Sequence, residues 1–202
     1  MSKVCETSRV AFRTLAAVCA VLVLWSSGPV AIDTRLTDVT EARATGGMIA
    51  LLPRAADAQM LTVVGGEPAD ELHLTLIDFG PDVSGRSGDD LARRLGDLMT
   101  RWAGEVKADV FGHATFSPGR PGECAVYLVG DSPELVDLRA SVTEVSTQLY
   151  QLPPQHDPWV PHITAKYGVL EGELTYSGPV MFDRVRLRWA GETRDFALHP
   201  AG

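Results

Sequence analysis

Two short segments of the chain repeat one pattern, in which a histidine and a threonine are separated by a single apolar residue. The first segment reads HLTLIDFG at residues 73–80, and the second reads HITAKYG at residues 162–168. Both lie in stretches that alternate with the period of a β-strand. Side chains two residues apart on a strand share a face, so each histidine lies beside its threonine while the apolar residue points the other way. The repeat predicts a domain of two similar halves, each contributing one strand to a common site.

The rest of the pattern predicts one α+β domain over residues 48–202. Strands are expected at residues 48–52, 71–79, 107–116, 123–130, 159–169, 178–189 and 194–198. A short helix at residues 54–61 and two long helices, one after Asp90 and one from Ser132, lie between the strands. Both long segments carry apolar residues at helical spacing. Ser87 and Asp90 have capping-box spacing, and Ser132-Pro133 is a typical helix start. We expect the strands to be mostly antiparallel.

Length and charge exclude several classes of protein. The chain has 202 residues, of which 45% are hydrophobic, which is enough for one domain with a substantial core. Residues 48–202 carry 13 basic and 22 acidic side chains, a formal charge of −9. Such an acidic domain is poorly suited to holding long DNA or RNA through its overall field. The three cysteines, Cys5, Cys19 and Cys124, form neither a disulfide framework nor a zinc site.

The first 47 residues differ from the rest of the chain. Three basic residues precede the apolar stretch LAAVCAVLVLW at residues 15–25, which is the arrangement of a secretory signal. The cleavage region at residues 26–31 fits that reading poorly because of its proline. Residues 1–47 are therefore interpreted as a leader, disordered or cleaved, with the domain at residues 48–202. We expect a cytoplasmic protein, with export or membrane tethering through residues 1–31 as the alternative.

The paired histidines suit phosphodiester chemistry that needs no metal ion. An imidazole titrates near neutral pH, so one copy can accept a proton while the other donates one. His73 and His162 are therefore the candidate acid–base pair. The hydroxyls of Thr75 and Thr164 can hold the non-bridging phosphate oxygens between them. Which histidine is the base depends on the direction of the reaction and stays open.

The paired tetrads resemble those of the 2H phosphoesterase superfamily, which includes 2′-5′ RNA ligase-like proteins and cyclic phosphodiesterases. The tetrads read HLTL at residues 73–76 and HITA at residues 162–165, and Pro161 precedes the second. The resemblance covers about residues 48–198. It implies a two-lobed α+β fold, with mostly antiparallel sheets around a central cleft and helices on the outside. It also implies hydrolysis of a nucleotide or RNA-end phosphodiester: a 2′,3′-cyclic phosphate, a 2′-5′ linkage or a cyclic oligonucleotide. We expect neither a cofactor nor a metal ion.

Three further residues are candidates for substrate binding. Phe79 and Tyr167 follow the two motifs and could stack on a base or a ribose. Arg184, Arg186 and Arg188 alternate along one strand and share a face. Arginine is well suited to phosphate, which makes Arg186 a candidate ligand, although a solvated strand face explains the same pattern.

Three other interpretations remain open. The same fold could serve as a non-catalytic nucleotide- or RNA-binding module, or the leader could dominate the biology of an exported protein. His156, Asp157 and His162 could hold a metal, although their spacing matches no known ligand set. As partners we expect a small nucleotide or a short RNA end, not long DNA, and a membrane only through the leader. We expect a monomer.

Overall fold

The computed structural model describes residues 44–130, 132–169 and 171–198. Residues 1–43 of the predicted leader lie outside the described residues, and so does His199. The elements in chain order are β1 (Gly47–Pro53), α2 (Ala55–Leu61), β2 (Leu74–Gly80), α3 (Asp89–Arg101), β3 (Val106–Phe116), β4 (Cys124–Gly130), α4 (Pro133–Thr147), β5 (His162–Tyr167), the 3-10 turn η1 (Glu171–Glu173), β6 (Gly178–Trp189) and β7 (Glu192–Ala197). Within the described ranges, no helix is long and apolar enough to cross a membrane.

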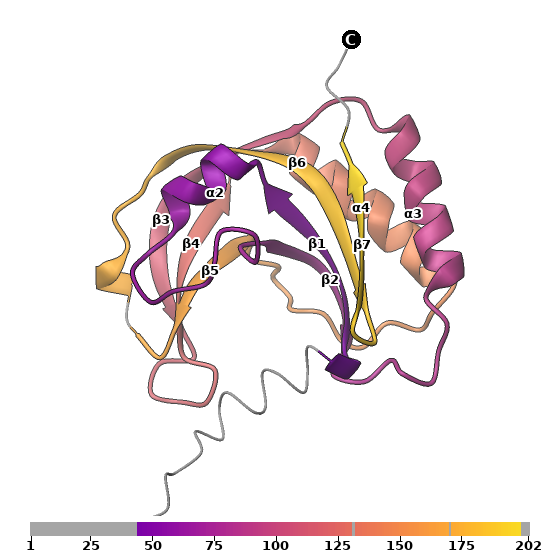
Figure 1. Cartoon of the computed structure of the whole chain (residues 1–202), viewed down its shortest axis with the longest axis horizontal. Helices are drawn as coiled ribbons and strands as arrows, with labels where there is room; N and C mark the ends of the chain where they lie inside the picture. Colours follow the sequence, from indigo (N-terminus) through magenta and orange to yellow (C-terminus); the bar gives the residue numbers. More distant parts are fainter. Residues whose placement is uncertain (1–43, 131, 170, 199–202) are drawn as a thin grey trace, which may run out of the picture. The chain divides into compact units, whose positions relative to one another are not determined.

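The seven strands form one sheet in which every pairing is antiparallel. Their order is β1-β2-β5-β4-β3-β6-β7, and β1 also pairs with β6, so six of the strands form a closed ring. The long strand β6 connects β3 with β7. Its residues 178–182 pair with β3, and its residues 184–189 pair with β7. Figure 1 shows the resulting layer as a strongly curved arch. The two sheet halves expected from the sequence are thus continuous.

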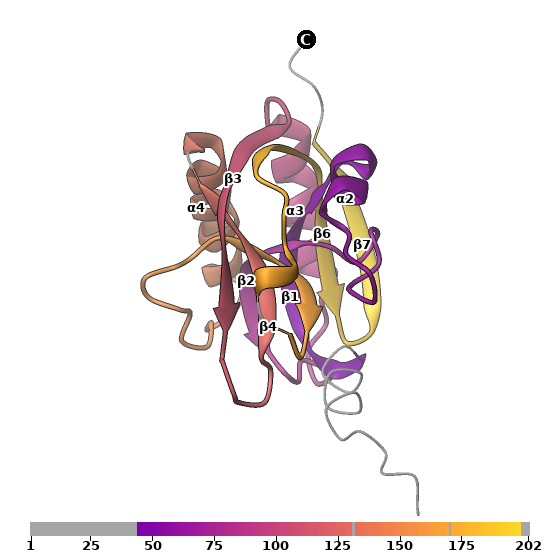
Figure 2. The same ribbon diagram turned by 90° about the vertical axis from the view of Figure 1, so that its left-hand side faces the viewer.

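The helices pack against different strands of the sheet. α3 and α4 pack against each other, α3 also contacts β7, and α4 contacts β2 and β3. Figure 2 shows α4 and α2 on opposite sides of the strands. The apolar stripes of α3 and α4 are buried as their spacing predicts; their buried apolar residues are Leu91, Ala92, Leu95, Met99, Leu135, Leu138 and Val142. These stripes and the inward-facing strand residues form one core, which confirms the predicted α+β class.

Local differences from the predictions have simple causes. Helix α4 begins as predicted, because the Ser132 hydroxyl accepts a hydrogen bond from the Leu135 amide at 3.1 Å. The capping box predicted for α3 is wrong. Gly88 takes the N-cap position, so the Ser87 hydroxyl reaches Asp89 instead. Strand β5 is shorter than predicted, since the proline at position 161 has no N–H group for a ladder and Gly168 has a φ of 72°.

Candidate active site

The two motifs meet where β2 pairs with β5. Leu74 lies opposite Ile163, and this pair sets the register of two antiparallel strands. Each motif histidine therefore falls beside the threonine of the other motif. Leu74 and Ile163 are fully buried, whereas the flanking motif residues are partly exposed, as the predicted alternation requires. Four polar side chains come together on one face in this way: His73, Thr75, His162 and Thr164.

Both motif histidines are held by the same kind of hydrogen bond. Nδ1 of His73 lies 2.6 Å from the carbonyl oxygen of Glu71, and Nδ1 of His162 lies 2.8 Å from that of Val160. A carbonyl oxygen can only accept, so Nδ1 carries the proton in each ring. Nε2 is then the atom that remains for proton transfer. The repeat seen in the sequence thus extends to the tautomer of the two imidazoles.

The surroundings lower the pKa of both imidazoles below the ordinary value of 6.5. Burial is the largest cause in each case, because it disfavours the charged ring. The hydrogen bonds to Glu71 and Val160 act in the opposite direction. The nearby Arg188 lowers the pKa of His73 further, and His156 does the same for His162. Neutral imidazoles are the forms suited to accept a proton near neutral pH.

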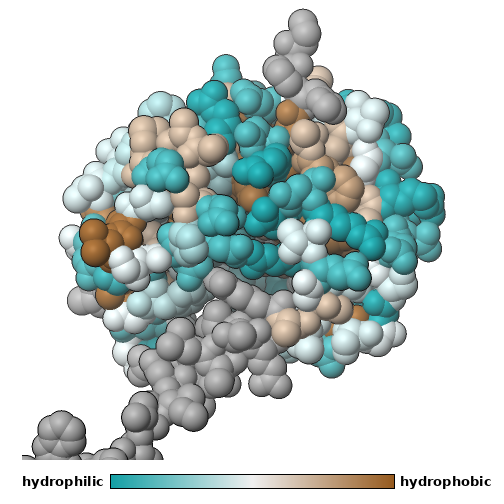
Figure 3. All heavy atoms as spheres, in the orientation of Figure 1, coloured by the Kyte–Doolittle hydropathy of each residue, from teal (hydrophilic) through white to brown (hydrophobic). Residues whose placement is uncertain are grey.

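A cavity of about 420 Å³ opens beside two of the four motif residues, which is within the range of small-molecule sites. Thr75 and His162 line it, whereas His73 and Thr164 are not among its lining residues. The remaining lining residues are Leu76, Asp78, Thr115, Phe116, Ser117, Arg139, Gln155, His156, Pro158, Trp159 and Val160. Figure 3 shows hydrophilic side chains across the middle of the face that Figure 1 presents.

Aromatic and cationic side chains line this cavity. The guanidinium carbon of Arg139 lies 4.3 Å from the ring centroid of Trp159, and its Nε donates to the carbonyl of Leu76 at 3.3 Å. Phe116 lies against His162 with ring centroids 4.6 Å apart. Sequence reasoning missed Arg139. The available signal was its place four residues after Leu135, beside the buried stripe of α4.

The structure separates the other predicted ligands from this cavity. Phe79 is 4% exposed and packs in the core against Tyr150 and Trp189. Tyr167 is 45% exposed at the end of β5, opposite Cys124. Arg186 forms two hydrogen bonds with the carboxylate of Asp195, at 2.7 and 2.9 Å. None of these three predicted residues lines the cavity.

A third His-x-Thr tetrad, HATF at residues 113–116, also lies on a strand and escaped the sequence analysis. His113 pairs with Tyr127, and Tyr127 pairs with Ile163, the residue between the two members of the second motif. Paired residues share a face, so His113 points away from the four motif side chains. Its Nε2 lies 2.7 Å from the carbonyl of Tyr176. The register therefore turns His113 away from the site, whereas Thr115 and Phe116 of this tetrad line the cavity.

The alternative metal site at His156, Asp157 and His162 does not assemble. Among residues 44–130, 132–169 and 171–198, no group of three or more His, Cys, Asp or Glu side chains is placed to hold a metal ion. His156 and His162 line the same cavity, but Asp157 does not. The donor set of that hypothesis is thus incomplete.

An antiparallel α+β domain with two neighbouring His-x-Thr strands agrees with the resemblance to the 2H phosphoesterases. The sequence model of the 2′-5′ RNA ligase superfamily matches residues 64–183, more than half of the chain, and the chain belongs to this family. The match includes both tetrads, which lie at positions 73–76 and 162–165.

A solved structure agrees on the fold. TT0787 of Thermus thermophilus superposes with a TM-score of 0.52 at 17% identity, over 78% of this chain and 100% of that one. LigT of E. coli in its apo form gives a TM-score of 0.49 at 18% identity, over 78% of this chain and 98% of that one. No curated protein sequence matches the chain significantly.

Proposed function

We propose that the protein is a metal-independent phosphodiesterase that acts on a nucleotide or an RNA-end phosphodiester. The observation that carries the proposal is the shared arrangement of His73 and His162. Each ring is fixed through Nδ1, and each adjoins a threonine of the other motif. Two imidazoles that present the same nitrogen are suited to work as a general base and a general acid.

The proposed reaction is hydrolysis in which water attacks phosphorus from the side opposite the leaving group. One neutral imidazole takes a proton from water through Nε2 while the water oxygen attacks phosphorus. The bond from phosphorus to the leaving ribose oxygen breaks, and the other imidazole, protonated beforehand, gives its proton to that oxygen. The hydroxyls of Thr75 and Thr164 donate hydrogen bonds to the non-bridging oxygens. Each histidine contributes about 10²- to 10⁴-fold in rate.

The cavity supports a small nucleotide as the substrate class. Trp159 and Phe116 offer aromatic surfaces beside His162, and bases stack on such surfaces regardless of sequence. Arg139 lies over Trp159 and brings a cation to the same cavity. A 2′,3′-cyclic nucleotide, a 2′-5′ linkage or a cyclic oligonucleotide combines a base with a reactive phosphodiester. The acidic domain favours these over long RNA.

The full-length protein should be incubated in EDTA with 2′,3′-cyclic nucleotides, 2′-5′-linked dinucleotides and cyclic dinucleotides, and the products separated by chromatography. We expect turnover of at least one class by the wild type and by His113→Ala, and turnover slower by about 10²- to 10⁴-fold in His162→Ala. Loss of turnover in EDTA that a divalent metal restores would contradict the proposal. Binding without turnover by folded wild type would instead support a nucleotide-binding module.

A further inference from the structure

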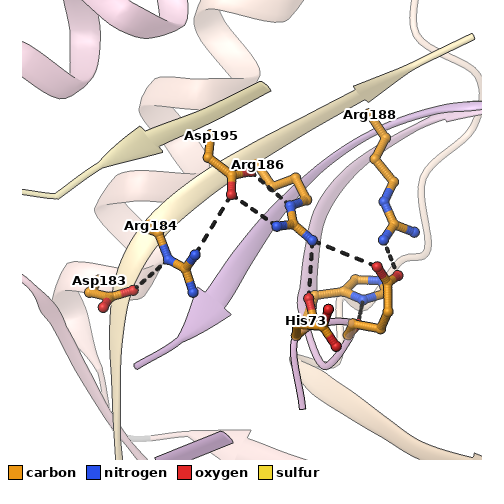
Figure 4. Close-up of polar contacts among 8 residues, drawn as sticks. His73, Asp183, Arg184, Arg186, Arg188 and Asp195 are labelled. Atoms are coloured by element: carbon orange, nitrogen blue, oxygen red, sulfur yellow. Dashed lines mark hydrogen bonds and ion pairs between the residues drawn. The ribbon is translucent and has the colours of Figure 1, made fainter. Parts of the chain in front are cut away.

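Three arginines of β6 lie side by side on one face and are all paired with acidic groups. Figure 4 shows Arg184, Arg186 and Arg188 in a row, and His73 lies toward the Arg188 end of this row. Arg184 pairs with Asp183 at 3.0 Å and with Asp195 at 3.7 Å. Arg186 and Arg188 are only 13% and 14% exposed, so their ion pairs are shielded from water far better than surface pairs.

The last two arginines of this row hold the segment that precedes the first motif. Arg188 forms a hydrogen-bonded ion pair with the carboxylate of Glu71. Nη1 of Arg186 lies 4.0 Å from the same carboxylate and donates to the carbonyl of Asp70 at 3.1 Å. The carbonyl of Glu71 is the group that accepts the Nδ1 proton of His73. Glu71 therefore contacts the arginines through its side chain and the imidazole of His73 through its backbone carbonyl.

Among the residues that the structure describes, the second motif has no such arrangement. The carbonyl that holds His162 belongs to Val160, an exposed apolar residue that cannot form an ion pair. The two histidines thus share a hydrogen bond but differ in what fixes its acceptor. This difference between otherwise matching halves shows that the ion pairs at Glu71 are a feature of the first motif alone.

We infer that Glu71 is a positioning residue for His73, and that Arg188 and Arg186 hold its carboxylate so that its carbonyl fixes the His73 tautomer. The inference rests on the proposed function for its consequence in catalysis, but not for its structural content. It also gives Arg186 a role in place of direct phosphate binding. Two of its nitrogens are bonded to Asp195 and a third to the backbone of Asp70, so they are occupied within the protein.

The charges around His73 make the inference testable by titration. Three charged groups act on the imidazole: Arg188 lowers its pKa, whereas Glu71 and Glu67 raise it. Arg188→Ala removes a charge that lowers the His73 pKa, while Arg186 stays near the carboxylate of Glu71, so this loss of charge by itself raises the pKa. Glu71→Gln removes a charge that raises the His73 pKa, so this loss of charge by itself lowers it. A loss of packing alone would not separate the two variants in this direction.

The experiment follows the imidazole nitrogens of ¹⁵N-labelled full-length protein by NMR over a range of pH. His73 and His162 are assigned from spectra of His73→Gln and His162→Gln. In the wild type we expect both neutral rings to carry the proton on Nδ1. In both Glu71→Gln and Arg188→Ala we expect partial loss of the Nδ1–H tautomer of His73, and we expect a lower His73 pKa in Glu71→Gln than in Arg188→Ala. The signals of His162 should stay unchanged.

The matched control is Arg184→Ala, which removes an arginine from the same face of the same strand without touching Glu71. It should leave the His73 signals as they are. With a substrate in hand, kcat should fall roughly 10- to 100-fold in Glu71→Gln and Arg188→Ala with little change in KM. Arg188→Lys keeps a cation opposite Glu71 and should recover part of the loss, whereas Arg184→Ala should keep the kcat of the wild type.

An unchanged His73 tautomer and pKa in both variants would overturn the inference. Glu71→Gln preserves the shape of the side chain, so it decides the matter if Arg188→Ala fails to fold. Absence of turnover by the wild type would refute the proposed function, while the NMR result would still decide the role of Glu71.

Discussion

Leu74 of β2 lies directly opposite Ile163 of β5, and both side chains are fully buried. In the described part of the chain this is the single residue pair that joins the two strands. It closes the ring of strands and sets each motif histidine beside the threonine of the other motif. The two motifs therefore meet at one apolar pair between residues far apart in the sequence.

Leu74→Ala and Ile163→Ala should each lower the free energy of unfolding by about 2–5 kcal/mol, because each leaves a cavity in a closed core. Since the two side chains face each other, the double variant should deviate from additivity by roughly 0.5–3 kcal/mol. Urea denaturation of the four proteins measures this coupling. The control cycle combines Ile163→Ala with Leu52→Ala. Leu52 lies on β1, and β2 lies between β1 and β5. Equal coupling in both cycles would contradict the role of the pair.

The three His-x-Thr tetrads allow a test within one chain. His73→Gln and His162→Gln should each lower kcat by about 10²- to 10⁴-fold, since each removes one partner of the proton transfer. His113→Gln should retain the activity of the wild type, because His113 faces away from the site and bonds the carbonyl of Tyr176. Steady-state kinetics on the substrate class that the wild type turns over provide the measurement. A comparable loss in His113→Gln would show that the register argument fails.

Trp159 should contribute to binding only where the substrate carries a base. Stacking of a base on an aromatic ring is worth about 1–3 kcal/mol, so Trp159→Leu should raise KM for a 2′,3′-cyclic nucleotide accordingly. The base-free 2′,3′-cyclic phosphate of ribose should be hydrolysed equally by variant and wild type. Trp102→Leu, at the end of α3 and not among the cavity-lining residues, is the control. An equal effect on both substrates would exclude a stacking role.

Stability should fall in mild acid because of the two histidines. The folded protein lowers the pKa of both His73 and His162 below 6.5, mainly by burial, so the unfolded chain takes up these protons first. Their contribution is therefore fully present above about pH 6.5 and is lost as the pH falls toward their folded-state pKa values. Denaturation of the wild type and His73→Gln at about pH 7.5 and about pH 5 measures it. We expect a smaller loss in His73→Gln, and equal losses would refute this prediction.

Features that depend on neighbours along the chain were predictable. The alternation of β2 and β5, the Ser132 cap of α4 and the full length of β6 follow from the local pattern of apolar, polar and turn residues. The wrong capping box shows the limit of such reasoning. A shift of one residue in the helix start is enough to change what Ser87 contacts.

The family could be predicted from the chain alone, because the resemblance resides in short motifs and their spacing. The same motifs did not distinguish the tetrad at 113–116 from the other two, nor indicate that Arg139 lies over Trp159 or that Arg186 is bonded to Asp195. These facts are set by the register between strands and by the packing of α4 on the sheet. Both bring together residues that are distant in the chain, so the choice of side chains that share the site was made by the tertiary structure.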